Sequence, residues 1–222
     1  MNKWTKRIIT LLAVLSVVFI IVGYIIVQYG FFSAKQAALV DFKLKSPDFH
    51  YKPWVYVLYI HIITASMALA IGLYQMLRNP IGKQRTVWHK RVGKLYAYSI
   101  LISGVVNMYL SAYASGGWIA KLGFFTLDFL WIYTTFKSVS YARKKLIEAH
   151  RNWMYRSYAL TFAGITLRIV LGPLMMLFGE FTPAYQVTAW LSWGINLIIA
   201  EWFIYRSRVK PSLTTQQKVS IQ

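Results

Sequence analysis

The stretch WVYVLYIHIITASMALAIGLYQML, residues 54–77, decides the fold, because it is apolar for longer than the hydrocarbon core of a membrane is thick. An α-helix needs about 20 apolar residues to cross that core. The stretch has 24 residues and not one Asp, Glu, Lys or Arg, whereas a soluble helix carries charges on one face. It therefore predicts a transmembrane helix.

The whole chain has the composition of an integral membrane protein. Of its 222 residues 57% are hydrophobic, 17% are aromatic and only 14% are charged, and the mean hydropathy is +0.45. A soluble domain of this length needs far more polar surface. The chain has no cysteine, which excludes disulfides, iron–sulfur clusters and thiolate metal sites. A metal or haem iron would have to be bound by histidine, carboxylate or methionine.

The sequence predicts an all-α fold, a polytopic helix bundle with six transmembrane helices. We expect them at residues 8–28, 54–77, 95–114, 118–141, 153–178 and 186–205. The predicted organisation is a first transmembrane helix in 1–29, an outer loop in 30–53, a five-helix core bundle in 54–205 and a disordered cytoplasmic tail in 206–222. This organisation predicts a multi-pass protein of the cell membrane.

The basic residues predict the orientation of the helices. The chain carries 25 Lys and Arg against 6 Asp and Glu, a formal charge of +19. The two terminal segments and alternate loops hold 19 of these cations, the remaining loops hold 5, and Arg168 is left within a span. Because basic loops stay on the cytoplasmic side during insertion, both termini are predicted to be cytoplasmic. The charge then favours anionic lipid headgroups at the inner face as the partner, and not nucleic acid, because no loop is long enough to form a basic domain.

A partial repeat links the third and fifth predicted spans. His89 and Asn107 are 18 residues apart, and so are His150 and Arg168, which is five helical turns in each case. The offset of 61 residues predicts that spans two–three and four–five are copies of one hairpin. Small and polar residues also share one face of spans two, three and five, as expected for faces packed against other helices: His61, Ala65, Ala68, Gly72, Gln75; Gly93, Tyr96, Ile100, Ser103; Met154, Ser157, Thr161, Gly164.

Two candidate sites follow from the predicted depths. The outer intramembrane site comprises His61, Asn107, Asp128 and Arg168. Inserting one charged side chain alone costs roughly 2.5–3.5 kcal/mol, so we expect Asp128 and Arg168 to pair. An interhelical salt bridge with no further role would explain the pair equally well.

The candidate inner site lies at headgroup level on the cytoplasmic side. Its members are cationic or imidazole side chains with one carboxylate: His89, Arg91, His150, Arg151 and Glu201, with Lys90 beside them. Such a group could hold an anionic headgroup, a phosphate or haem propionates. Ordinary anchoring explains the lysine, but it does not need histidine at equivalent positions of a repeat.

Four strings resemble a known family. They are HIITASMALAIG (61–72), HKRVGKLY (89–96), HRNWMYRSYALTFAGITLR (150–168) and SWGINLIIAEW (192–202). Over roughly residues 54–205 the chain resembles bacterial membrane proteins catalogued as domain of unknown function 2306. The resemblance implies the membrane architecture and, as signature positions, His61, His89, His150, Arg168 and Glu201; it implies no activity. A looser likeness connects the chain with transmembrane b-type cytochromes.

Three functions remain open. The first is redox chemistry with haem b or a quinone as the cofactor, the candidate haem ligands being His89, His150 and His61; a quinone could bind His61, with Asp128 relaying the proton. The second is binding or transport of a small molecule or lipid, for which a Gly172-Pro173 break in the fifth span would serve. The third is a non-catalytic assembly factor with a membrane protein partner or a second copy of the chain. A metal site at His61 and Asp128 lacks a third ligand.

Overall fold

The computed structural model describes residues 3–44, 49–77 and 87–219. Their regular structure is helical, with no strand in these ranges. The α-helices are α1 (Lys3–Ile26), α2 (Ala38–Leu44), α3 (Tyr51–Leu77), α4 (Val87–Ala112), α5 (Gly117–Arg143), α6 (Ile147–Thr161), α7 (Ala163–Phe178) and α8 (Phe181–Val219). A π-helical turn (Val27–Phe31) and a 3₁₀ turn (Ala34–Gln36) lie between α1 and α2.

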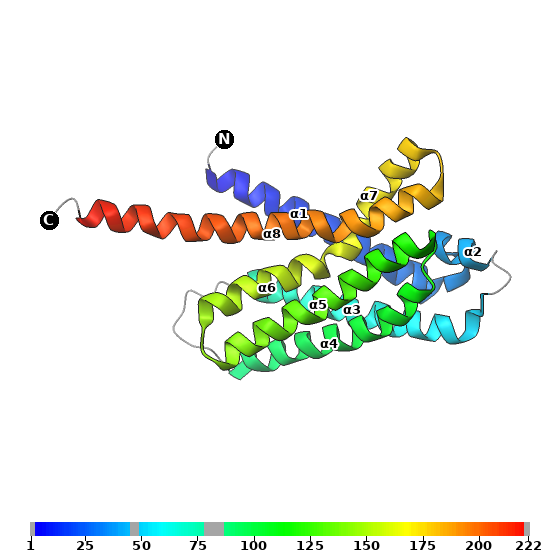
Figure 1. Cartoon of the computed structure of the whole chain (residues 1–222), viewed down its shortest axis with the longest axis horizontal. Helices are drawn as coiled ribbons and strands as arrows, with labels where there is room; N and C mark the ends of the chain where they lie inside the picture. The colour runs from blue at the N-terminus through cyan, green and yellow to red at the C-terminus, as the bar shows by residue number, and fades with distance from the viewer. Residues whose placement is uncertain (1–2, 45–48, 78–86, 220–222) are drawn as a thin grey trace. The chain divides into compact units, whose positions relative to one another are not determined.

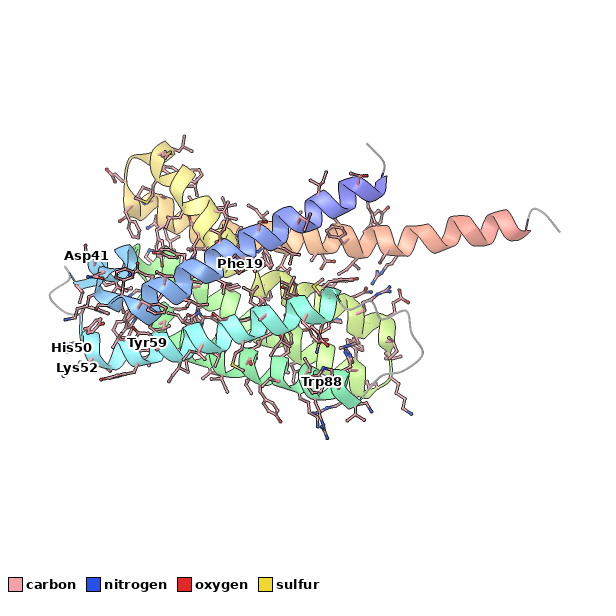
Figure 2. The ribbon with its side chains drawn as sticks, turned by 180° about the vertical axis from the view of Figure 1, so that it is seen from behind. Phe19, Asp41, His50, Lys52, Tyr59 and Trp88 are labelled. Carbon is pink, nitrogen blue, oxygen red and sulfur yellow. The ribbon has the colours of Figure 1, made fainter. Side chains whose placement is uncertain are left out.

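The chain divides into two compact units, Met1–Tyr56 and Val57–Gln222, with the boundary inside α3. The first unit contains α1, α2 and the first residues of α3. Here Lys43 lies over the Trp54 ring, 5.6 Å from its centre, and Phe49 meets the same ring edge-on. Figure 2 labels Asp41 on α2 and both His50 and Lys52 near the start of α3. The segment predicted as an outer loop therefore contains short helices.

The second unit is a helix bundle centred on α5. Helix α5 packs against α4, α6 and α8, and α8 packs in turn against α6 and α7. Figure 1 shows α4, α5 and α6 side by side. Helix α3 joins them through hydrogen bonds to α4 and α6. The start of α4, the turn between α5 and α6 and the start of α6 lie at one end of this bundle, which we call the basic end.

The enclosed position of α5 explains its polarity. Its buried residues include Asp128, Thr134, Thr135 and Ser138, because three neighbouring helices cover it and supply hydrogen-bond partners. Within the described part of the chain, three helices are long and apolar enough to cross a membrane: α3, α4 and α8. The bent pair α6–α7 would make a fourth. The count of six spans and the orientation stay predictions.

Two tight turns set the α4–α5–α6 arrangement. Between α4 and α5, Gly116 and Gly117 have φ angles of 96° and 72°, which residues with a Cβ rarely adopt. Helix α5 ends in a Schellman motif: the Leu146 N–H donates to the Tyr141 carbonyl and the Lys145 N–H to the Ala142 carbonyl. Lys145 has φ 61° at the position that glycine usually occupies. This short turn brings the start of α6 opposite the last turns of α5.

The predicted fifth span is two helices, not one. Helices α6 and α7 meet at Phe162 with a bend of 42°. The predicted break at Gly172-Pro173 is wrong, since α7 continues through Pro173 to Phe178. A side chain on α8 stabilises the actual bend. Asn196 donates to the Ala159 carbonyl (3.1 Å), which would face the Ala163 N–H in a straight helix, and accepts from the Thr166 hydroxyl (3.0 Å).

Helix α8 is the longest element, with 39 residues and a length of about 58 Å. It continues past residue 205, where the last predicted span ends, to Val219. The helix therefore includes most of the segment 206–222, for which the sequence predicts a disordered tail. Residues 220–222 lie outside the described ranges.

Candidate functional site

A hydroxyl network at the centre of the bundle fixes the register of α4 and α6. The Tyr96 hydroxyl on α4 lies 2.9 Å from the Ser157 hydroxyl on α6, and the Thr135 hydroxyl on α5 lies 2.7 Å from the same atom. Tyr96 and Ser157 are both buried, with 1% and 0% of their surfaces exposed. They are 61 residues apart, which is the offset of the predicted repeat. The repeat itself stays a prediction, but its offset describes the register of these two helices.

The same register sets the relative positions of His89 and His150 at the basic end. Helices α4 and α6 both begin at this end (Figure 1), so they run in the same direction. His89 lies seven residues before Tyr96 on α4, and His150 lies seven residues before Ser157 on α6. Seven residues are about two turns, or about 10.5 Å, and return to nearly the same helix face. The two imidazoles therefore start from matched positions on α4 and α6.

Ser138 holds the His150 ring. Nδ1 of His150 lies 2.9 Å from the carbonyl oxygen and 2.9 Å from the hydroxyl of Ser138 on α5. A carbonyl oxygen only accepts, so Nδ1 carries a proton and Nε2 is the nitrogen that can coordinate a metal. The Ser138 hydroxyl also lies 3.3 Å from the His150 carbonyl. This reciprocal contact fixes both the tautomer and the orientation of the ring.

The cations of the basic end are on its surface. His89, Arg91 and Arg151 are exposed, and His150 is half-buried. Figure 2 labels Trp88, beside His89 near the start of α4. Charged side chains at this position can contact an acidic group bound nearby without leaving water.

Glu201 belongs to a different contact from the one the sequence predicts. Its carboxylate on α8 accepts two hydrogen bonds from the Arg156 guanidinium on α6, and the one from the terminal nitrogen measures 2.9 Å. The guanidinium also lies over the Trp153 ring, 4.7 Å from its centre. Glu201 therefore joins α8 to α6 through Arg156, and these contacts do not link it to either histidine.

A second histidine–serine contact joins α3 to α4. Nδ1 of His61 lies 2.9 Å from the Ser103 hydroxyl and 3.3 Å from the Ser103 carbonyl oxygen. The same hydroxyl lies 3.4 Å from the His61 carbonyl. These are the same pairs of atoms that join His150 to Ser138. Both rings are thus held through Nδ1.

Asp128 binds neutral donors instead of the predicted cation. Asn107 donates to one carboxylate oxygen (2.8 Å) and Ser111 to the other (2.9 Å), both from α4. Only 1% of the Asp128 surface is exposed. We call these three residues the Asp128 cluster. The cluster brings Asn107 and Asp128 together, and Asp128 has two neutral partners on one helix in place of the expected Arg168.

Arg168 lies on an exposed face of α7. One of its terminal nitrogens donates to the Gly164 carbonyl one turn earlier, at 2.7 Å. It is within electrostatic range of His61 on α3 and Tyr185 on α8. Of the four predicted residues of the outer site, the structure thus joins Asn107 to Asp128 directly and His61 to the same α4 face through Ser103. Arg168 is near His61 but is not part of these hydrogen bonds.

The partners that sequence reasoning missed are mainly serines. Ser103 is already among the residues of the predicted packed face, and Ser111 follows Asn107 by one turn, so the same face of α4 could have revealed it. Ser138 could be recognised as a partner of His150 only once the three-residue turn between α5 and α6 is known, because that turn places the two residues opposite each other. Arg156 was visible in the string HRNWMYR, but its partner on α8 is 45 residues away.

The chemistry that these groups allow is limited. In the described ranges no three His, Cys, Asp or Glu side chains gather to hold a metal ion. A group that needs only two histidines, such as haem iron, requires no such cluster. Oriented imidazoles in a helix bundle suit haem ligation, hydrogen bonding to a carbonyl ligand, or proton transfer.

The comparisons with known proteins identify a family without an activity. No curated protein and no solved structure matches the chain. The family model described as a predicted membrane protein, domain of unknown function 2306, matches residues 58–204, which include α4 to α7 and most of α3. The chain therefore belongs to this family of predicted membrane proteins.

Proposed function

We propose that this membrane protein is a redox protein that binds haem b between His89 and His150 at the basic end. The observation that carries the proposal is the register of α4 and α6, in which Tyr96 contacts Ser157 and each histidine lies seven residues before its member of that pair. Two histidine ligands from different helices at one depth are what a bis-histidine haem requires.

The Ser138 contact favours a ligand role for His150. A metal-bound histidine usually donates its other ring N–H to a carbonyl or carboxylate, which orients the ring and raises its basicity. Ser138 supplies that acceptor at 2.9 Å. Arg91 and Arg151 would supply cations for the two propionates. Held by His89 and His150, haem would supply electron transfer.

The same proposal includes the six spans and their orientation. We assign the six spans to α1, α3, α4, α5, the pair α6–α7 and α8. Both termini and the basic end then lie at the cytoplasmic face of the membrane, where the basic end contacts anionic headgroups. The chain has no cysteine, so single cysteines can be added without background. Lys144→Cys should react with a membrane-impermeant maleimide only in inverted vesicles, and Glu180→Cys only in intact cells. The opposite pattern would reverse the orientation.

The haem proposal is tested by absorbance. The full chain, expressed with a haem precursor and purified in detergent, should have a Soret band that shifts on reduction. His89→Ala and His150→Ala should lose it, whereas His50→Ala, which changes an exposed histidine of the first unit, should keep it. Ser138→Ala removes only the hydroxyl and keeps the backbone carbonyl that accepts from Nδ1 of His150, so it should keep the band. A featureless visible spectrum of the unaltered chain after haem-supplemented expression would remove the proposal.

A second candidate function is binding or transport of a quinone or another small carbonyl compound near His61. It is favoured by the nearby cation of Arg168, which can donate to a carbonyl oxygen, and by the bend at Phe162. The probe is a short-chain ubiquinone. It should raise the melting temperature of the unaltered protein and not that of Arg168→Ala or His61→Leu. Equal stabilisation of all three proteins would count against this site.

A further inference from the structure

We propose that the Asp128 cluster is a proton-binding site inside the bundle, which exchanges its proton with water beyond the end of α4. This inference does not depend on haem. A carboxyl group in the interior of a membrane protein is costly to insert, and such groups commonly serve proton or ion movement. Asp128 is nearly fully buried, and no cation forms an ion pair with it in the described ranges.

The hydrogen-bond donors of the cluster fit both protonation states. With Asp128 ionised, the Asn107 amide donates to one oxygen (2.8 Å) and the Ser111 hydroxyl donates to the other (2.9 Å). With Asp128 protonated, its O–H can donate to the Ser111 oxygen, because a hydroxyl both donates and accepts. The Asn107 bond is the same in both states. The site can therefore gain and lose a proton by rotation of one hydroxyl, without movement of a helix.

The neighbouring helices leave the cluster without a permanent counter-charge. At this level α4 contributes Asn107 and Ser111, which are neutral, and α6 contributes the hydroxyl of Thr161 through its contact with Trp131. From α8 the ionisable side chain of Tyr185 packs on Phe124, one turn before Asp128. Arg168 of α7 acts electrostatically on Tyr185, and Lys121, two turns before Asp128 on α5, is exposed. A tight ion pair would fix the ionised state, and none is present here.

Ser111 places the cluster close to one end of α4, and a longer polar face of the same helix runs from Asn107 in the other direction. Ser111 is the next-to-last residue of α4, so the proton that leaves Asp128 through the Ser111 hydroxyl reaches the end of the helix within one turn. In the other direction Asn107 is followed, one turn along α4, by Ser103, whose hydroxyl contacts His61. One turn rises about 5.4 Å, a gap that one water molecule can bridge. The polar face of α4 thus connects the cluster with His61.

The test uses a hydrophobic carbodiimide on the full chain in detergent or native membranes. Dicyclohexylcarbodiimide adds to a protonated carboxyl group and leaves a stable acylurea, which mass spectrometry can locate. We expect modification at Asp128 at acidic pH and its progressive loss as the pH rises. Asp128→Asn should abolish it. A water-soluble carbodiimide should instead modify the exposed Glu180 or Glu201.

A second variant tests the hydrogen bonds themselves. Asn107→Ala removes a donor that favours the ionised carboxylate, so modification of Asp128 should persist to a pH about 1 unit higher. Asn152→Ala, which changes a buried amide elsewhere in the bundle, is the matched control and should leave the profile unchanged. An Asp128 that stays unmodified at every pH, or that is modified equally at every pH, overturns the proposal. Both of these outcomes are measured on the unaltered chain, so the test works even if Asp128→Asn does not fold. Neither outcome depends on haem binding.

Discussion

Replacing Gly72 by alanine should destabilise the bundle, because the new methyl group has no room. A Cβ at this position of α3 would lie 2.3 Å and 2.4 Å from two carbons of the Tyr158 ring on α6 and 3.1 Å from the Tyr96 ring on α4. Carbon atoms separate to about 3.5–4.0 Å, so the ring or the helix must move by roughly 1.2 Å or more. Tyr158 cannot turn away freely, since its hydroxyl donates to the Leu69 carbonyl on α3. Overpacking of this kind costs about 1–3 kcal/mol.

The assay is the thermal midpoint of the detergent-solubilised protein, followed by size-exclusion chromatography. For a chain of this size the expected loss is roughly 2–12 °C. Gly194→Ala on α8 is the matched control, because no atom lies within 4 Å of its added Cβ; it should be neutral or stabilise by up to about 1 kcal/mol. Gly104→Ala should fall between the two, since its closest contact, at 2.8 Å, is with the flexible side chain of Ile132. Equal midpoints for the Gly72 and Gly194 variants would refute the close packing of α3 against Tyr158.

Three further substitutions probe other contacts by the same thermal assay. Lys145→Gly should stabilise the protein by about 1 kcal/mol, because a residue with a Cβ is disfavoured at φ 61°; a loss of stability would show that the lysine side chain contributes more than the strain costs. Asn196→Leu should cost about 1–2 kcal/mol by removing the partners of the Ala159 carbonyl and the Thr166 hydroxyl, whereas an unchanged midpoint would mean that the bend does not depend on them. Arg156→Leu and Glu201→Leu should each destabilise, and together by less than their sum; strictly additive losses would contradict the ion pair, whose coupling we expect at about 1 kcal/mol.

Local patterns were enough to predict the all-helical fold and the buried face of α4. Tyr96, Ile100 and Ser103 are buried where the 3.6-residue period places them, and so are Ala68 and Gly72 on α3. The spacing of residues along one helix is given by the sequence, and the 3.6-residue period converts that spacing into a helix face. Such faces can therefore be predicted without a structure. The same pattern was less reliable on α7, where Gly164 is exposed because little besides α8 covers that helix.

Partners on other helices could not be predicted in the same way. The sequence placed Asp128 and Arg168 at similar depth, and charge alone suggested a pair, but rotation of each helix decides which side chains meet. Asp128 faces α4, and Arg168 turns back to its own helix. The bend at Phe162 was also unpredictable, because the amide that stabilises it belongs to α8, whereas Gly172-Pro173 looked like a break and lies in regular helix.

The bend at Phe162 has a consequence for motion in the bundle. The side-chain amide of Asn196 on α8 bridges the last turn of α6 and the first turn of α7. The angle between α6 and α7 is therefore set by a third helix and not by the two helices that meet at the bend. A sliding or rotation of α8 by a fraction of a turn would withdraw that bridge from both sides at once. The hairpin formed by α7 and the start of α8 could then rotate as one body about Phe162. The hydroxyl network that joins α4, α5 and α6 would stay intact.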